Sequence, residues 1–297
     1  MRVIEVGPRD GLQNESTPIP TELKVAFIKA LQAAGIKEIE ATSFVSPKWV
    51  PQLADSGDVV KAVTGEISVL VPNMKGLERA LELGVKRIAL FTAASDQFTK
   101  KNINMSVAES LEVFADVANA FRQTVPDGWI RGYVSTAFEC PYAGPIAPEK
   151  TFDVAMKLME IGVDEVSIGD TIGVAAPHEV KILTPMLTDE IPADKIAYHF
   201  HDTRGTAIAN VQAAIDLGIT AFDSSAAGLG GCPYAPGAGG NLATEDLVYL
   251  LERSGYSTGI DLVSLAKASL PILQELNLSP RSKCQIAVLA SELPQTQ

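Results

Sequence analysis

Two histidines that stand two residues apart, in the stretch IAYHFHDT at 196–203, are the first residues of this sequence that could do chemistry. The chain has three histidines in all, and His199 and His201 lie in an apolar and aromatic run that is typical of a β-strand. Because side chains alternate between the two faces of a strand, these imidazoles share one face, about 6–7 Å apart. That spacing suits one shared metal ion, and it equally suits two hydrogen-bonded histidines in a protein core.

Other polar residues stand where further predicted strands end, or just beyond them. They are Arg9, Asp10, Glu40, Asp170 and Asn241. A divalent ion would explain this convergence, with nitrogen ligands from the two histidines and oxygen ligands from Asp10 and Asn241. Such a ligand set, without thiolate, favours Mg²⁺, Mn²⁺ or Co²⁺ over structural zinc. Taken alone, Asp10 could equally cap its own backbone in an Asp-Gly turn, and Arg9 could be a surface or ion-paired arginine.

A glycine-rich segment, GLGGCPYAPGAGGN at 228–241, follows the last predicted strand. Its six glycines and two prolines exclude helix and strand, so we expect a mobile loop that closes over the site and excludes water. Cys232 in its middle is either a bystander thiol or an acid/base group that closure carries in. A segment this poor in apolar residues gives little reason to bury a cysteine for packing, which favours the functional role. We expect no chemical role for Cys140 or Cys284.

A pattern that occurs four times predicts the elements that position these residues. Each copy contains a helix end, a glycine, Ile or Val, and a short apolar strand that runs into polar residues; the copies span 33–43, 82–92, 160–170 and 216–226. The glycines fit the left-handed conformation that ends a helix and are Gly35, Gly84, Gly162 and Gly218. Ser106 and Glu109 form a capping box that predicts the start of another helix.

Four further strands are predicted between these copies, at 3–6, 67–71, 129–135 and 196–201. Eight strands that alternate with helices predict a parallel sheet, and at this chain length an α/β fold of the (β/α)8 TIM barrel type. A doubly wound open sheet is the structural alternative, but no GxGxxG follows the first strand. After an eighth helix at about 244–254 we expect another helical segment at 261–277. We therefore predict one barrel domain over 1–297, with a C-terminal helical extension from about residue 258.

Composition limits the kinds of partner. The net charge is −12 without a run of basic residues, which argues against nucleic acid binding through a broad basic surface. The three cysteines are widely spaced and contain no CxxC, as expected in a reducing compartment. No run of 18 apolar residues predicts a membrane span, and no signal peptide is apparent. We expect an intracellular protein that acts on a small molecule, either in the cytoplasm or, if a transit peptide was removed, in the mitochondrial matrix.

Four long motifs resemble those of the hydroxymethylglutaryl-CoA lyases. They are VIEVGPRDGLQNE at the start, IEATSFVSPKWVPQ at 39–52, HFHDTRG, and GLGGCPYAPGAGGN. The resemblance extends from residue 3 to at least residue 255. Arg-Asp-Gly after the first strand and His-x-His on the seventh are shared with a wider group of metal-dependent lyases and Claisen-type synthases. The segment SFVSPKWVPQ and the cysteine loop are what indicate the lyases.

This resemblance implies a carbon–carbon lyase that cleaves hydroxymethylglutaryl-CoA to acetyl-CoA and acetoacetate, a step of leucine breakdown and ketone-body formation. It implies that Asp10, His199, His201 and Asn241 hold the metal, with Mg²⁺ or Mn²⁺ expected. Arg9 would contact the substrate carbonyl and Cys232 would be the active-site cysteine. Glu40 matches a functional acidic position, and Gln13 and Asp170 are expected to bind substrate. A homodimer is the expected assembly.

Several alternatives stay open at this point. Either Asp10 or His199 could take the proton of the tertiary alcohol, although ligation of a metal weakens both as free bases. Arg204 is a departure, because an aromatic residue is expected after His-x-His-Asp-Thr; it lies past the ligands and affects only local loop packing. A synthase or aldolase acting on 2-oxo acids would keep Arg9, Asp10 and the histidine pair but would not need Cys232. A non-catalytic barrel that senses a metal or an acyl-CoA is the other rival.

Overall fold

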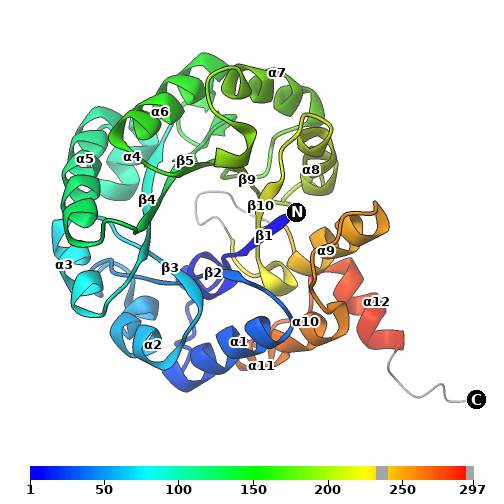
Figure 1. Cartoon of the computed structure of the whole chain (residues 1–297). Coiled ribbons are helices and arrows are strands. Elements are labelled where there is room, and N and C mark those ends of the chain that lie inside the picture. Colours follow the sequence, from blue (N-terminus) through cyan, green and yellow to red (C-terminus); the bar gives the residue numbers. More distant parts are fainter. Residues whose placement is uncertain (232–239, 292–297) are drawn as a thin grey trace, which may run out of the picture.

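Eight parallel strands close into a barrel and a ring of helices surrounds it (Figure 1), in a computed structural model that describes residues 1–231 and 240–291. Around the barrel the strands follow the order β1-β10-β9-β8-β5-β4-β3-β2, so that β1 and β10 close it. Their bounds are β1 Arg2–Glu5, β2 Glu38–Ser43, β3 Glu66–Leu70, β4 Arg87–Ala93, β5 Trp129–Ser135, β8 Glu165–Asp170, β9 Ile196–Phe200 and β10 Ala221–Ser224. The predicted TIM barrel is confirmed, and each of the eight predicted strands is present.

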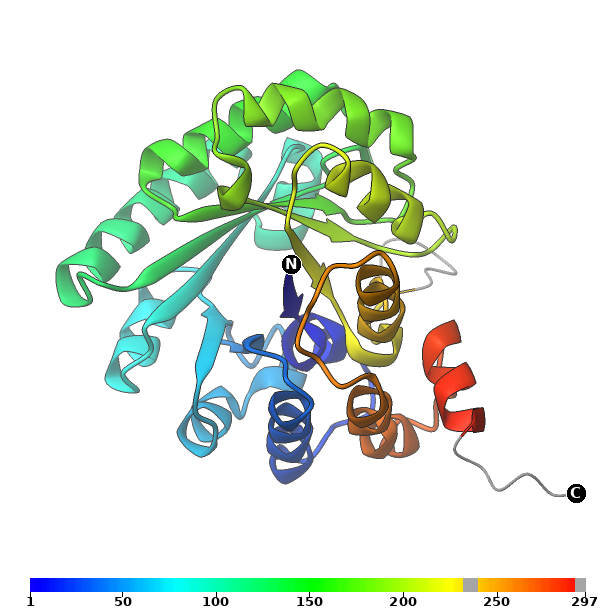
Figure 2. The same ribbon diagram turned by 45° about the vertical axis from the view of Figure 1, so that its right-hand side comes forward.

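The helices pack their apolar faces onto the outside of the barrel, where most of the hydrophobic core lies. They are α1 Thr21–Ala33, α2 Ser56–Ala62, α3 Met74–Glu82, α4 Asp96–Ile103, α5 Val107–Thr124, α6 Pro148–Ile161, α7 Pro177–Thr188, α8 Ala207–Ile215 and α9 Thr244–Arg253. Three more follow: α10 Leu262–Ala268, α11 Leu270–Glu275 and α12 Lys283–Ser291. Figure 2 shows α10 and α11 beside α1, and α12 beside α9. Within the described residues, none of these helices is long and apolar enough to cross a membrane.

The local signals that predicted helix ends are confirmed. The four repeat glycines, Gly35, Gly84, Gly162 and Gly218, all have positive φ, between 70° and 102°. The capping box at the start of α5 is complete, since Ser106 Oγ accepts from the Glu109 N–H and Glu109 accepts from the Ser106 N–H. These positions depend on a few neighbouring residues, which explains why the sequence alone was sufficient.

Three local features differ from the prediction or were not foreseen. The chain after β1 forms a single turn of π-helix, η1 (Gly7–Gly11), where a simple turn was one expectation. A short hairpin, β6 (Glu139–Cys140) with β7 (Gly144–Pro145), was not predicted. The strand expected to reach His201 ends at Phe200, and His201 instead forms an isolated antiparallel bridge with Asn241. That bridge brings the end of the glycine-rich segment beside the histidines.

Candidate active site

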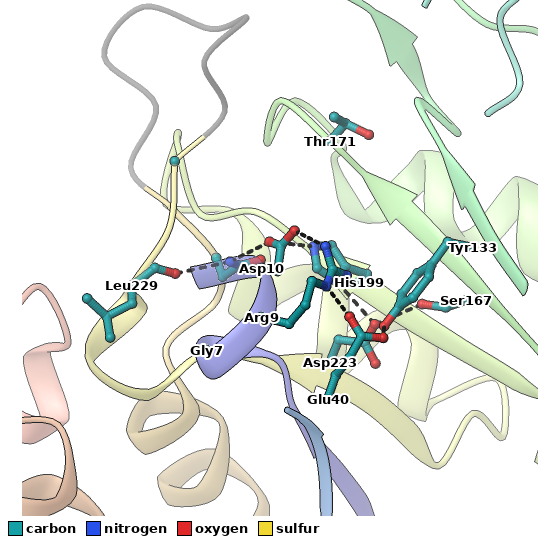
Figure 3. A network of polar contacts seen from close by, with 12 residues as sticks. Gly7, Arg9, Asp10, Glu40, Tyr133, Ser167, Thr171, His199, Asp223 and Leu229 are labelled. Atoms are coloured by element: carbon teal, nitrogen blue, oxygen red, sulfur yellow. Dashed lines mark hydrogen bonds and ion pairs between the residues drawn. The ribbon is translucent and has the colours of Figure 1, made fainter. Parts of the chain in front are cut away.

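The first strand delivers Arg9 and Asp10 to the carboxyl end of the barrel through η1. The backbone N–H groups of Asp10 and Gly11 both donate to the carbonyl of Val6, at 2.7 and 3.2 Å, which closes this π-helical turn. Single turns of π-helix are frequently found at functional sites. Figure 3 shows Arg9 and Asp10 side by side at this turn, with His199 next to them.

Asp10, His199 and His201 form a cluster that could hold a metal ion. One ligand atom from each lies within 4.8 Å of the others, and the two imidazole centroids are 5.2 Å apart. Asn241 lies against this cluster, because its Nδ2 donates to Asp10 Oδ2 at 2.9 Å and to the carbonyl of Leu229 at 3.0 Å. The four predicted ligands are therefore brought together, although they come from three separate parts of the sequence.

The protonation and the unused atoms of these residues fit a cation. Burial opposes ionisation of Asp10, but the charges of Arg9 and of the histidines hold its pKa at about 2. Burial lowers the pKa of His201 to about 4, which keeps this imidazole neutral and its lone pair available. His201 Nδ1 and Asn241 Oδ1 are buried and have no hydrogen-bond partner within residues 1–231 and 240–291. Buried polar atoms are normally paired, so a bound cation would explain why these two atoms have no partner among the described residues.

Arg9 is held from two sides. Its Nε donates to Glu40 Oε1, and its Nη1 donates to Asp10 Oδ1 at 2.7 Å. The second oxygen of Glu40 accepts from the hydroxyl of Tyr133 at 2.9 Å, and Glu40 itself is fully buried. Arg9 lies between the two carboxylates in Figure 3. This places Glu40 as the residue that orients Arg9, on the side of the guanidinium away from the cluster.

Asp170 is buried at the end of β8, and both of its oxygens are engaged by its own loop. They accept from the N–H groups of Val174 and Ala175, each at 3.0 Å. Burial raises the pKa of Asp170 to about 6. These bonds give Asp170 a role in shaping the loop beside the site. Gln13 is half-buried in the turn after η1, and Cys232 lies outside the described residues.

The loops after β8 and β9 are joined by Arg204, which stands where an aromatic residue was expected. Its Nη1 donates to the carbonyls of Ile172 and Gly173, both at 3.0 Å. Gly173 has φ +61°, and it lies so close to Thr203 that a Cβ on Gly173 would be 2.7 Å from Thr203 Oγ1. Arg204 therefore fastens two rim loops that already pack tightly together.

Sequence reasoning missed several polar residues that lie beneath the site in the barrel interior, among them Arg131, Tyr133, Glu165, Ser167 and Asp223. Asp223 Oδ2 is 3.1 Å from His199 Nδ1, and Asp223 is 1% exposed. Despite its burial, the charge of Arg131 and the bond to His199 keep the pKa of Asp223 below its usual range. The available signal was a charged residue inside each of two apolar strands, WIRGYVS and AFDS.

Known proteins resemble this chain over nearly its full length. A family model described as HMGL-like matches residues 1–272. The mitochondrial hydroxymethylglutaryl-CoA lyase of Rattus norvegicus is 49% identical, over 95% of this chain and 88% of that protein. For the hydroxymethylglutaryl-CoA lyase of Pseudomonas mevalonii the identity is 47%, over 98% of this chain and 97% of that protein. The crystal structure of the lyase from Pseudomonas aeruginosa superposes with a TM-score of 0.94 at 47% identity, covering 98% of this chain and 97% of that one. This chain belongs to the HMGL-like family.

Proposed function

We propose that this protein is a carbon–carbon lyase that cleaves hydroxymethylglutaryl-CoA to acetyl-CoA and acetoacetate. The observation that carries the proposal is the meeting of Asp10, His199, His201 and Asn241 beside Arg9 at the carboxyl end of the barrel. That end of a TIM barrel is where catalysis takes place. Relatives with nearly half of their residues identical carry the same activity in their names.

The reaction is a retro-Claisen cleavage. The hydroxyl on C3 loses its proton, the bond between C2 and C3 breaks, and the C3 oxygen becomes the ketone of acetoacetate. The electron pair of the broken bond passes to C2 as the enolate of acetyl-CoA, which must then accept a proton. The site therefore has to promote loss of one proton, stabilise an enolate oxygen and supply one proton.

A divalent cation is the group that the cluster fits, with Mg²⁺ or Mn²⁺ proposed. Asp10, His199, His201 and Asn241 would hold it through one carboxylate, two imidazoles and one amide oxygen, a set that hard or borderline ions accept. When bound, it supplies Lewis acidity that makes a hydroxyl or carbonyl oxygen of the substrate more reactive.

Arg9 would donate to the thioester oxygen as enolate charge develops on it. A guanidinium stays charged and its N–H groups lie in one plane. It is therefore suited to donate hydrogen bonds to an enolate oxygen at a defined position. Glu40 and Asp10 hold two of its nitrogens, so the side chain is oriented before substrate arrives. Preorganised donors of this kind cost no rearrangement during the reaction.

Cys232 would protonate the acetyl-CoA enolate. The support is the motif resemblance and the chemistry of an ordinary thiol, which is mostly protonated at neutral pH because its pKa is about 8.5. For the alcohol proton, Asp10 and His199 are both candidates. His199 Nε2 lies 4.0 Å from Asp10 Oδ2, so these two candidate bases are close to each other in the site.

The decisive experiment measures acetoacetate released from hydroxymethylglutaryl-CoA in the presence of Mg²⁺ or Mn²⁺. We expect steady turnover that needs the added ion. A parallel assay with acetyl-CoA and a panel of 2-oxo acids tests the condensing alternative. Turnover with 2-oxo acids and none with hydroxymethylglutaryl-CoA would replace the lyase with a synthase or aldolase, and binding without any turnover would indicate a sensor.

We also propose a location and an assembly. The relatives include mitochondrial proteins and a bacterial one, and we propose the corresponding compartments, the mitochondrial matrix or the bacterial cytoplasm. The expected homodimer stays a prediction, which size-exclusion chromatography with light scattering can test.

A further inference from the structure

A chain of buried charges fills the barrel beneath the site. Arg131 on β5 donates through Nη2 to Asp223 Oδ1 on β10 at 2.6 Å, and its Nε lies 2.9 Å from Glu165 Oε1 on β8. Each of these three side chains is no more than 2% exposed. Layers of branched apolar side chains usually occupy this part of a TIM barrel. Even when they are paired, buried charges often stabilise a fold no better than apolar side chains of the same volume, so their presence here suggests a function.

The second oxygen of Asp223 faces the metal cluster. Oδ2 accepts from Ser167 Oγ at 2.9 Å and lies 3.1 Å from His199 Nδ1. A carboxylate paired with a guanidinium can only accept hydrogen bonds, so the hydrogen in this contact belongs to His199 Nδ1. In the neutral imidazole Nε2 then has a free lone pair, and it faces Asp10 Oδ2 at 4.0 Å. Figure 3 shows Asp223 on one side of His199 and Asp10 on the other.

His201 lacks such an arrangement. Its Nδ1 is buried and finds no hydrogen-bond partner within the described part of the chain. The two histidines of the pair are thus held differently, although they are only two residues apart and their rings are 5.2 Å apart.

We propose that Asp223, clamped by Arg131 and Ser167, is a positioning residue that holds His199 as the Nδ1–H tautomer with Nε2 directed at the ion. His199 is then ready to bind before the ion arrives, whereas His201 takes its tautomer and orientation from the ion itself. This inference rests on the proposed metal site, and it concerns the protein before any substrate is bound. Carboxylate partners of ligating histidines commonly fix the ring in this way, and losing one weakens metal binding about 10- to 100-fold.

The test uses nitrogen NMR of the metal-free protein labelled with ¹⁵N-histidine. The pH is set well above the pKa of a free imidazole because, despite its burial, Asp223 and Asp10 raise the pKa of His199. The chain contains only three histidines, so a His178→Gln variant and a His201→Gln variant are enough to assign the signals. We expect His199 to show a single Nδ1–H tautomer and His201 to show a mixture. Adding Mn²⁺ or Mg²⁺ with a direct binding measurement then gives the dissociation constant.

Asp223→Asn is the informative substitution. The amide oxygen should stay with Arg131, which leaves the NH₂ group facing His199 Nδ1 and forces the opposite tautomer, with the hydrogen on Nε2. The equivalent exchange in the serine protease triad produces the wrong tautomer with little change in geometry. We expect the His199 signals to switch and the metal dissociation constant to rise about 10- to 100-fold. Asp216→Asn, at an exposed helix end, is the matched control and should change neither.

Ser167→Ala keeps the inference testable if Asp223→Asn does not fold. It removes one bond to Asp223 without changing any charge, so it should broaden the His199 tautomer population and weaken metal binding by less than tenfold. If Asp223→Asn folds and keeps the Nδ1–H tautomer of His199 and wild-type metal affinity, Asp223 is only the counter-ion of Arg131. If Asp223→Asn does not fold, the same conclusion follows when Ser167→Ala leaves the tautomer population and the metal affinity unchanged. The tautomer is read without substrate, so failure of the lyase assay leaves this result standing.

Discussion

The two sides of strand β5 are both buried, yet they are built from different kinds of side chain. On β5, Ile130 and Val134 belong to the apolar layer between strands and helices, whereas Arg131 and Tyr133 face the polar interior. Gly132 lies against Leu158 of α6, where a Cβ would come within 3.0 Å of the leucine. At this position the outer side is closely packed with apolar groups, and the inner side carries paired charges. The difference teaches that stability and chemistry are assigned to separate faces of the same strands.

Removal of the metal should have the largest effect on turnover. It changes only residues on the inner side of the barrel. Chelation should abolish release of acetoacetate, and added Mg²⁺ or Mn²⁺ should restore it. His201→Ala should weaken metal binding and leave the circular dichroism spectrum and the Tm close to wild type, because the barrel packs through its outer side. Full turnover after metal removal has been verified by elemental analysis would contradict the proposed role of the cluster.

Loss of the proposed acid should come next. Cys232→Ser keeps the size of the side chain but offers a far weaker acid, and a positioned acid contributes about 10²- to 10⁴-fold to a rate. We expect kcat to fall within that range while metal content stays unchanged. Cys140→Ser is the control, because Cys140 is buried against Ser95 at the hairpin and should leave kcat near wild type. A Cys232→Ser enzyme with most of its kcat would make water or a histidine the proton donor.

Arg9→Lys tests the donor that faces the substrate. Lysine keeps the charge but cannot bond Glu40 and Asp10 while presenting a planar donor to the enolate oxygen. Loss of one such donor typically costs about 2.7–4 kcal/mol, or about 10²- to 10³-fold in kcat. We expect that fall with metal affinity near wild type. A rise confined to KM would mean that Arg9 binds substrate and transition state equally well.

A substitution on the outer side should have the reverse signature. Leu158→Ala removes a fully buried side chain between α6 and β5. Such truncations cost about 2–5 kcal/mol of unfolding free energy. We expect a lower urea concentration at the midpoint of unfolding. At urea concentrations well below that midpoint, kcat should stay within about twofold of wild type, because the site lies on the inner face of the strands. A large fall in kcat of the folded variant would show that the two faces are coupled.

The last prediction concerns a buried carboxylate, Glu245, which forms no ion pair within residues 1–231 and 240–291. Glu245 accepts from the N–H of Ala227 at 3.0 and 2.9 Å, and burial raises its pKa from 4.5 to about 8. The folded protein therefore binds a proton that the unfolded chain has already lost above about pH 4.5. The contribution of Glu245 to the free energy of unfolding then falls as pH rises from about 4.5 to about 8. Glu245→Gln should flatten that slope in urea titrations at several pH values, and an unchanged slope would assign it to other groups.

Most of the helices and strands could be predicted from local sequence patterns. A helix-ending glycine such as Gly162, or the capping box of Ser106 and Glu109, depends on residues a few positions away, and the structure confirms both. The π-turn at 7–11 was not foreseen, because Gly-Pro-Arg-Asp-Gly is equally compatible with an ordinary turn. The hairpin at 139–145 was missed because two-residue strands have no periodicity to detect.

For the site, the sequence by itself determined which residue types collect at one rim, since every strand of a parallel barrel ends on the same side. It therefore placed Asp10, His199, His201 and Asn241 together. Only the tertiary structure decided how they are held. Asn241 meets Asp10 across 231 residues of sequence, and Arg131 meets Asp223 across 92, because closing β1 against β10 sets these contacts. A charged side chain inside the barrel can pair only with side chains of other strands, and these come within reach only once the barrel has closed. No local sequence pattern encodes which residue that partner is.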